Sequence, residues 1–167
     1  MGVAEDVLGR IAGGELVIID GGMGSQLQAE GVPMDELAWS ARANLDQPGV
    51  VQHVHEEYIR AGAEVIIANT YASGRAALEP AGLGSRVAEA NRSAVRAALR
   101  AREAAATGPV AVAGSMSSFS AARRPGQAPE HQEIGASAGQ RLRAAAVRQP
   151  VPGCSASAAL IASAIWS

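Results

Sequence analysis

Short apolar segments rich in β-branched residues alternate with longer segments of helical periodicity along the first 120 residues. The apolar segments cover residues 16–20, 64–69 and 110–114. Short runs of this kind, bounded by glycine or polar residues, are typical of buried strands. The order strand, helix, strand, helix, strand predicts a parallel sheet with right-handed helical crossovers, and therefore an α/β fold.

The helices expected between these strands begin and end at recognisable residues. The first crossover helix has Asp46 as its N-cap, Pro48 in its first turn and Gly62 at its end. The second runs from about residue 85 to residue 106, where Thr107-Gly108-Pro109 stops it. Two shorter helices are expected at residues 1–15 and 25–31, with an irregular loop over residues 32–45.

Each predicted strand is followed by a polar residue, namely Asp20, Thr70 or Ser115. In parallel α/β architectures ligands bind beyond the carboxyl ends of the strands, so these residues are expected together at one end of the sheet. An alternative for Asp20 is a turn aspartate that caps the next helix. Asn69, beside Thr70, either binds a ligand or satisfies backbone groups at the strand end.

The glycine-rich turn Gly21-Gly22-Met23-Gly24 raises the alternative of a nucleotide-binding loop. The spacing argues against it, because the dinucleotide fingerprint needs a third glycine where Leu27 stands, and no P-loop lysine follows. Asp20 would also set a carboxylate beside the pyrophosphate, which is unfavourable without a metal. A domain that binds a small anion at this turn is retained as an alternative function.

Two histidines in the first crossover helix, His53 and His55, suggest a metal site at first sight. Residues two apart on a helix point to nearly opposite sides, so these two side chains cannot share an ion. His53 and Glu57 have a suitable spacing, but the HExxH pattern is absent. We therefore expect both histidines to lie on a solvated helix face.

The amino-acid composition of the sequence changes after about residue 120. Residues 121–167 hold 2 of the 16 acidic residues and no apolar segment like the earlier strands. A tail dominated by Ala, Ser, Arg and Pro buries little apolar surface per residue. We expect residues 1–120 to fold and residues 121–167 to form a divergent, poorly ordered tail without a fourth parallel strand. A frameshift or truncated gene near residues 120–135 would explain the change.

Composition excludes several classes of function. The net charge of −2 favours neither nucleic acid nor an anionic membrane as a partner, and no apolar run approaches the roughly 20 residues of a membrane span. All basic residues are Arg, so no lysine is present for Schiff-base chemistry. The single cysteine, Cys154, forms no internal disulfide, and the acidic amino terminus lacks an apolar signal core. A cytoplasmic location is therefore expected.

Five stretches, in order, resemble the homocysteine S-methyltransferase family, whose fold is a (β/α)₈ TIM barrel. They are Asp20-Gly-Gly-Met-Gly-Ser-Gln-Leu27, Trp39-Ser40-Ala41, His55-Glu-Glu-Tyr-Ile-Arg-Ala-Gly-Ala63, Ile66-Ile-Ala-Asn-Thr70-Tyr-Ala-Ser73 and Val112-Ala-Gly-Ser115. The resemblance covers about residues 8–120. It implies a partial barrel domain that consists of the first three strand–helix units, followed by the divergent tail.

The resemblance implies methyl transfer to the thiol of homocysteine, which gives methionine. It places Asp20 and Gly21 at the homocysteine site, with the ammonium group of the amino acid as the expected partner. Thr70 is implied to line the same pocket, and Ser115 is a further candidate. A carboxylate and hydroxyl groups suit a small zwitterion at the mouth of a barrel.

The resemblance also implies a zinc ion, held by three cysteine thiolates, that activates the homocysteine thiol. This chain contains only Cys154, and its surroundings match neither of the family's cysteine motifs. We therefore assign no catalytic residue, no metal ligand and no cofactor to this chain, and expect a truncated chain without activity of its own. A different possibility is a non-catalytic partner that supplies a partial barrel to another chain.

Overall fold

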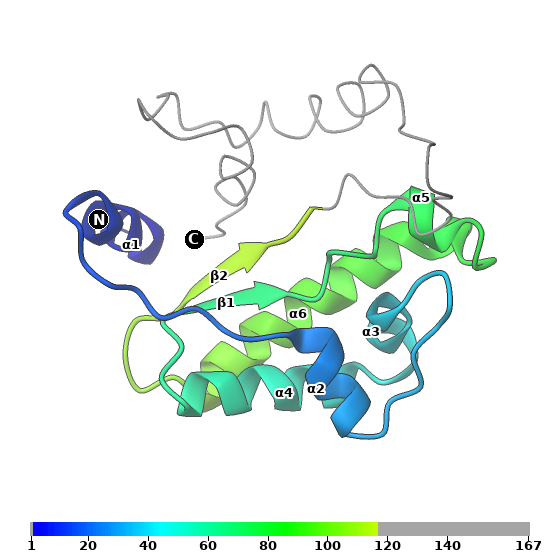
Figure 1. Ribbon diagram of the computed structural model, residues 1–167, viewed down its shortest axis with the longest axis horizontal. Helices are drawn as coiled ribbons and strands as arrows, with labels where there is room; N and C mark the ends of the chain where they lie inside the picture. Colours follow the sequence, from blue (N-terminus) through cyan, green and yellow to red (C-terminus); the bar gives the residue numbers. More distant parts are fainter. Residues whose placement is uncertain (1, 117–167) are drawn as a thin grey trace, which may run out of the picture.

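A short parallel sheet covered on one face by two long helices forms the centre of the computed structural model, which describes residues 2–116 (Figure 1). The strands are β1 (Val65–Ala68) and β2 (Ala111–Gly114), and they pair in parallel with Val65 opposite Ala111. The long helix α6 (Val87–Ala105) lies between them in the sequence. The predicted strand–helix–strand order is confirmed for these elements.

Residues 16–20 run parallel to β1 but pair with it only briefly. One bridge joins Ile19 to Val65, and the backbone amide of Glu64 donates to the carbonyl of Ile18 at 2.8 Å. Leu16 is 92% exposed and Ile18 is 57% exposed. The expected position beside β1 is confirmed, but the expectation of a buried strand is wrong. Within residues 2–116 no strand pairs with the outer edge of this segment, which leaves its apolar side chains exposed.

Most of the predicted helices form, with shifted ends. The elements that match are α1 (Val3–Ala12), α2 (Met23–Ala29), α4 (Pro48–Arg60) and α6. Gly62, at a φ of 103°, follows the end of α4 as expected. The expected N-cap of α4 is wrong, because Gln47 occupies that position. Asp46 instead ends the preceding helix, and its carboxylate accepts a hydrogen bond from Nε of Arg42 at 2.9 Å.

Four short helical elements were not expected from the sequence. They are the 3₁₀ helix η1 (Ser40–Arg42), α3 (Ala43–Asp46), α5 (Arg75–Leu78) and the 3₁₀ helix η2 (Gly84–Arg86). The first two replace the second half of the irregular loop predicted over residues 32–45. Each has three or four residues, which is too short for helical periodicity to be visible in the sequence.

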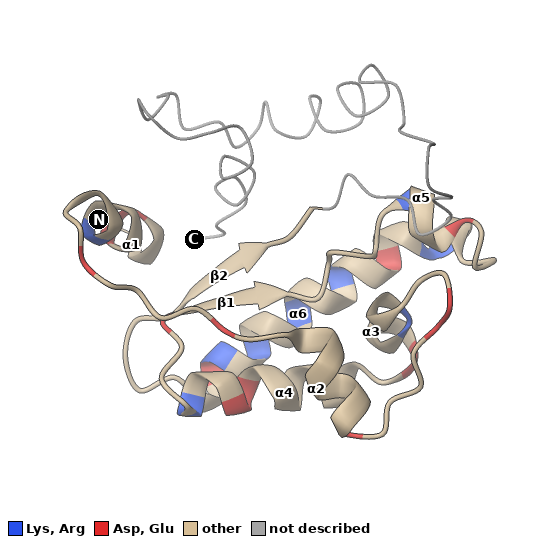
Figure 2. Cartoon of the chain, viewed as in Figure 1, with Lys and Arg blue, Asp and Glu red and all other residues tan. Residues whose placement is uncertain are grey.

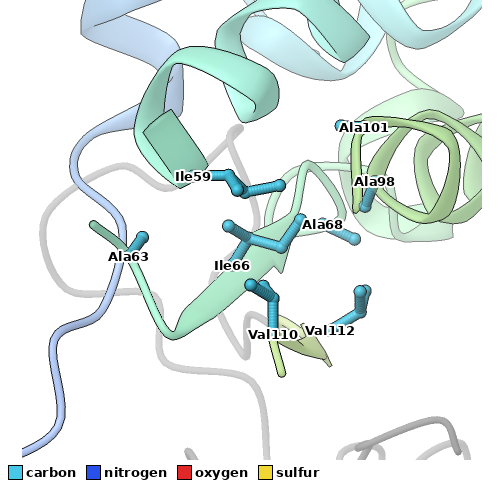
Figure 3. Packing of buried hydrophobic residues seen from close by; sticks show 8 residues of the cluster. All are labelled: Ile59, Ala63, Ile66, Ala68, Ala98, Ala101, Val110 and Val112. Atoms are coloured by element: carbon cyan, nitrogen blue, oxygen red, sulfur yellow. The ribbon is translucent and has the colours of Figure 1, made fainter. Parts of the chain in front are cut away.

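The main core lies between the sheet and the helices α4 and α6. Figure 3 shows Ile59 of α4 and Ala98 of α6 converging on Ile66 of β1 and Val112 of β2. Alternate strand residues point to the same face, so Ile66 and Ala68 both meet the helices. The face that α6 buries consists of alanines, whose small side chains let the helix approach closely: Ala90, Ala94, Ala97, Ala98 and Ala101.

The opposite face of the sheet carries the remaining strand residues. Val65, Ala111 and Ala113 cluster there with Val7, which is the buried residue of α1. The strands themselves carry no charge, and the charged residues lie on helices and loops (Figure 2). In the part of the chain that the structure describes, no helix is long and apolar enough to cross a membrane.

The described residues form a mixed fold of helices and strands with a two-stranded parallel sheet, which is consistent with part of an α/β fold. The expectations about residues 121–167, including the missing fourth strand and the environment of Cys154, lie outside the described residues.

A larger side chain at Ala98 should destabilise the chain. Ala98 is fully buried in the centre of the core. Overpacking of this kind costs about 1–3 kcal/mol, so we expect Ala98→Leu to lower the free energy of unfolding, measured with urea, by that amount. Arg100→Leu, at an exposed position of the same helix, is the control and should change it by less than about 0.5 kcal/mol. Equal effects of the two substitutions would contradict the observed orientation of α6.

Candidate functional site

Asp20 is built into the edge of the sheet. Its backbone amide donates to the carbonyl of Val65 at 2.9 Å, and its Oδ2 accepts the backbone amide of Ile67 at 2.7 Å. Its side chain is only 1% exposed, and Oδ1 has no hydrogen-bond partner among the described residues. The alternative of a capping aspartate is wrong, since Gly22 is the N-cap of α2 and receives no side-chain cap.

His55 lies directly behind Asp20 and is fully buried. Its Nδ1 is 3.9 Å from Oδ2 of Asp20, and neither ring nitrogen has a hydrogen-bond partner within residues 2–116. The expectation of a solvated face is therefore wrong for His55. On α4, residues four apart share a face, and both Val51 and Ile59 are buried, so His55 is carried inward with them. His53 is about half exposed, as expected, with Nε2 3.6 Å from Glu57.

Burial shifts the pKa values of both groups. Burial raises the pKa of Asp20 to about 6, and the hydrogen bond from the Ile67 amide opposes this shift. Burial lowers the pKa of His55 to about 4. At neutral pH Asp20 is therefore a carboxylate beside a neutral imidazole. Near pH 5 the pair is uncharged, because Asp20 holds a proton and His55 does not.

Gly21 brings the backbone close to Tyr58. A Cβ atom at position 21 would lie 2.9 Å from the hydroxyl oxygen of Tyr58. No larger residue fits there unless the phenol ring moves. Burial, and then the negative charge of Asp20, raises the pKa of Tyr58. Gly21 and Tyr58 thus form one side of the surroundings of Asp20.

Gly24 leaves room for the indole ring of Trp39, which packs directly against the backbone there. A Cβ at position 24 would lie 2.6 Å from Cζ2 of the indole. Trp39 itself adopts a φ of 46°, which is rare for a large side chain. Asp35 holds this turn, because its backbone pairs with that of Trp39 in both directions and its Oδ1 accepts the amides of Leu37 and Ala38. This glycine is therefore explained by a close contact with a side chain.

Asn69 is the centre of a buried network at the end of β1. Its Nδ2 donates to the carbonyl of Ser40 at 2.9 Å and to Oδ1 of Asn44 at 3.0 Å. Its Oδ1 accepts the hydroxyl of Ser40, and its carbonyl accepts Nδ2 of Asn44. Of the two alternatives for Asn69, satisfying groups within the protein is the one observed. The sequence gives no sign of the Ser40 and Asn44 contacts, which join segments 25–29 residues apart.

Thr70 and Ser115 meet at the carboxyl ends of the two strands. The Thr70 hydroxyl donates to the carbonyl of Ser115 at 2.7 Å and accepts the amide of Ser115 at 2.9 Å. The expectation that these two residues lie together is confirmed. Asp20 is next to β1 at Ile67, three residues before Thr70, and no hydrogen bond between Asp20 and Thr70 or Ser115 occurs within residues 2–116. The hydroxyl of Thr70 is thus occupied by the backbone.

Within residues 2–116, the site residues coincide neither with a group of possible metal ligands nor with the cavity beside α5. No group of three His, Cys, Asp or Glu side chains that could hold a metal ion exists among residues 2–116. Three cysteine thiolates for zinc are therefore not found there, and Cys154 lies outside that range. An open cavity of about 500 Å³ is lined by residues that include Arg75, Glu79 and Asn91 but none of the predicted site residues.

Comparison with known proteins gives a consistent picture. The family model for homocysteine S-methyltransferase matches residues 17–151. The homocysteine S-methyltransferase 2 of Zea mays is 36% identical over 106 residues, which are 61% of this chain and 31% of that protein. The homocysteine S-methyltransferase of Escherichia coli is 31% identical over 118 residues, which are 64% of this chain and 36% of that protein.

Two solved structures of a homocysteine methyltransferase are similar to this chain. The homocysteine methyltransferase MmuM from Escherichia coli in its oxidized form superposes with a TM-score of 0.56 and 32% identity, over 61% of this chain and 37% of that chain. Its metallated form gives a TM-score of 0.55 and 27% identity, over 87% of this chain and 47% of that one. The chain spans about a fifth to a little over a third of the length of the curated relatives it matches.

The buried pair should give two variants opposite pH dependences of stability. In Asp20→Asn, His55 is the member of the pair that still titrates with a shifted pKa, from an ordinary value of 6.5 to about 4. His55 then binds more protons in the unfolded chain, so its contribution to stability rises by about 3 kcal/mol between pH 4 and 6.5. In His55→Leu, Asp20 is the member of the pair that still titrates with a shifted pKa, from 3.8 to about 6 or above. The folded chain then binds more protons, so stability falls by about 3 kcal/mol between pH 4 and 6.

In the unsubstituted chain the two effects oppose each other, so this pair should contribute little pH dependence between pH 4 and 6. Urea unfolding of the three proteins at half-unit steps of pH measures these slopes. If both variants change the slope of the unsubstituted chain in the same direction, Asp20 and His55 are not both buried.

Proposed function

We propose, because this chain belongs to the homocysteine S-methyltransferase family, that it carries part of a binding site for homocysteine at the carboxyl ends of its strands. The family match over residues 17–151 includes Asp20, Gly21, Thr70 and Ser115. The observation that carries the proposal is the state of Asp20. One of its oxygens is held by a backbone amide, while the other is buried without a partner in the described part of the chain.

A buried carboxylate with a free oxygen favours a cationic partner. Removing a carboxylate from water is costly, and an ammonium group recovers much of that cost through a charge-assisted hydrogen bond. The ammonium group of homocysteine supplies such a donor. In this proposal it binds Oδ1 of Asp20, while Oδ2 stays on the amide of Ile67.

The other proposed site residues act on the shape of the pocket. The Thr70 hydroxyl already binds both the carbonyl and the amide of Ser115. Thr70 and Ser115 therefore form a rigid wall between the ends of β1 and β2. Gly21 contributes by its lack of a side chain, since the space beside it is filled by Tyr58.

We also propose that this chain by itself does not transfer methyl groups to homocysteine. An unperturbed thiol of this kind has a pKa near 8.5, so only a few per cent is thiolate at neutral pH. The chain has one cysteine and three histidines, which do not match the three cysteine ligands expected from the family resemblance. Binding of the amino acid end without thiol activation leaves the main barrier in place.

A second candidate function is that of a partial barrel that completes another chain. The observation that favours it is the exposed apolar edge at residues 16–20, where Leu16 is 92% exposed. An unpaired edge of this kind is a ready template for a further strand. The small-anion alternative has less support, because Gly24 is explained by the contact with Trp39.

Homocysteine should bind through Asp20, and calorimetric titration of the full chain at pH 7.5 tests this. We compare homocysteine with 4-mercaptobutanoate, which lacks only the amino group. The unsubstituted chain should bind homocysteine about 10–100-fold more tightly, as expected for a charge-assisted hydrogen bond. Asp20→Asn should abolish this difference, whereas Asp46→Asn, an exposed aspartate, should leave it unchanged.

The preference for homocysteine should also rise with pH. Asp20 must be ionised to bind an ammonium group, and its pKa is raised to about 6. The preference should therefore be weak at pH 5 and reach its full value above pH 7. A preference that persists in Asp20→Asn, or that does not change between pH 5 and 7.5, would argue against Asp20 as the partner.

Methionine formation should be undetectable with the purified full chain. The assay supplies homocysteine with S-methylmethionine or S-adenosylmethionine and added Zn²⁺, and the bound metal is measured in parallel. Stoichiometric zinc, together with turnover that a chelator abolishes, would overturn the proposal that the chain is inactive by itself.

A further inference from the structure

We propose that His55 is a positioning residue for Asp20, in which the neutral imidazole donates its Nδ1 proton to the Asp20 carboxylate. The contact orients the carboxylate and keeps it ionised, so that Oδ1 remains available to a cationic ligand. The coupling of the two side chains does not depend on any ligand. Its consequence for ligand binding rests on the proposed homocysteine site.

The first support is the pattern of unsatisfied atoms. Among the described residues, three buried side-chain polar atoms lack a hydrogen bond, and all three belong to this pair: Oδ1 of Asp20 and both ring nitrogens of His55. Buried polar groups without partners are rare in folded proteins and are costly. Their concentration in two adjacent side chains marks this place as an exception that packing does not explain.

The second support is geometry. Nδ1 of His55 lies 3.9 Å from Oδ2 of Asp20, which is about 1 Å beyond a charge-assisted hydrogen bond. Both side chains are closed off from solvent, at 0% and 1% exposure, so water does not compete for the contact. The Ile67 amide holds Oδ2 in place, so a movement of the His55 ring by about 1 Å toward Oδ2 would form the hydrogen bond.

The third support is the chemistry of a neutral histidine. A neutral imidazole has one donor nitrogen and one acceptor nitrogen, and a neighbouring group selects which is which. A carboxylate only accepts hydrogen bonds, so it selects the form with the proton on Nδ1. Burial keeps His55 neutral at pH 7 by lowering its pKa to about 4. Tyr58, a further titratable group close to Asp20, has a raised pKa and is neutral as well.

A donor facing the carboxylate must favour its ionised form. Burial alone raises the pKa of Asp20, and each hydrogen bond to the carboxylate lowers it again. If the His55 contact is lost, Asp20 should hold its proton to higher pH. A protonated Asp20 no longer attracts an ammonium group, so His55 controls the pH range in which the site can work.

The test is nuclear magnetic resonance of the full chain. The carboxyl ¹³C shift of Asp20, followed against pH, gives its pKa, and the ring ¹⁵N shifts of His55 report the position of the proton. His55→Leu removes the donor but keeps a bulky side chain. His55→Asn keeps a neutral amide donor near the position of Nδ1. His53→Asn, on the exposed side of the same helix, is the matched control.

We expect the proton on Nδ1 in the unsubstituted chain at pH 7. His55→Leu should raise the pKa of Asp20 by about one unit or more, while His55→Asn and His53→Asn should leave it within about half a unit. An unchanged pKa in His55→Leu would overturn the proposal. If the variants do not fold, the unsubstituted chain still decides, because a proton on Nε2 instead of Nδ1 also overturns it.

The outcomes separate this inference from the proposed function. A chain whose Asp20 pKa responds to His55→Leu but that binds no homocysteine supports the coupling and refutes the homocysteine site. A chain that binds homocysteine through Asp20, with the same pH profile in His55→Leu, supports the site and refutes the coupling. If both hold, the pH midpoint of homocysteine binding should move upward in His55→Leu by the same amount as the pKa of Asp20.

Discussion

The hydrogen bond from the Ile67 amide to the carboxylate of Asp20 is the contact on which the rest of the site depends. In a regular parallel ladder a backbone carbonyl accepts such an amide. Here a side chain does so at 2.7 Å. The chain therefore leaves the sheet at Gly21 and Gly22, and the side chain of Asp20 lies close to His55 of α4. Burial of the carboxylate, its raised pKa and its contact with His55 all follow from this replacement.

The framework around Asp20 is rigid because its other polar groups satisfy one another. Asn69 ties the end of β1 to Ser40 and Asn44, and Thr70 ties it to Ser115. The alanine-rich face of α6 lets that helix pack closely on one face of β1 and β2, which also fixes the position of the strand ends. Against this background the unpaired atoms of Asp20 and His55 are distinctive, since in the described residues every other buried side-chain polar atom has a partner.

The elements that were predicted correctly are those with a long or unmistakable pattern. The helices α4 and α6 run for 13 and 19 residues, so their apolar faces repeat several times. Short runs such as Val65–Ala68 were identified by their β-branched residues and their flanking turns. Local signals failed where a tertiary contact competes with them. Asp46 is a good N-cap by type, but its carboxylate binds Arg42, and Gln47 takes the cap position.

The sequence by itself determined the order of β1, β2 and the long helices α4 and α6, the parallel pairing of the two strands, and the meeting of Thr70 and Ser115 at the strand ends. These follow from chain connectivity and from residue periodicity, which are local properties. Only the tertiary structure decided that Asp20 accepts an amide of β1, that Asn69 serves a buried network, and that His55 is fully enclosed. The physical reason is that each of these depends on a partner 25–47 residues away along the chain, or on which face of α4 meets the sheet. The spacing of His55 from Val51 and Ile59 is the one local sign that pointed inward.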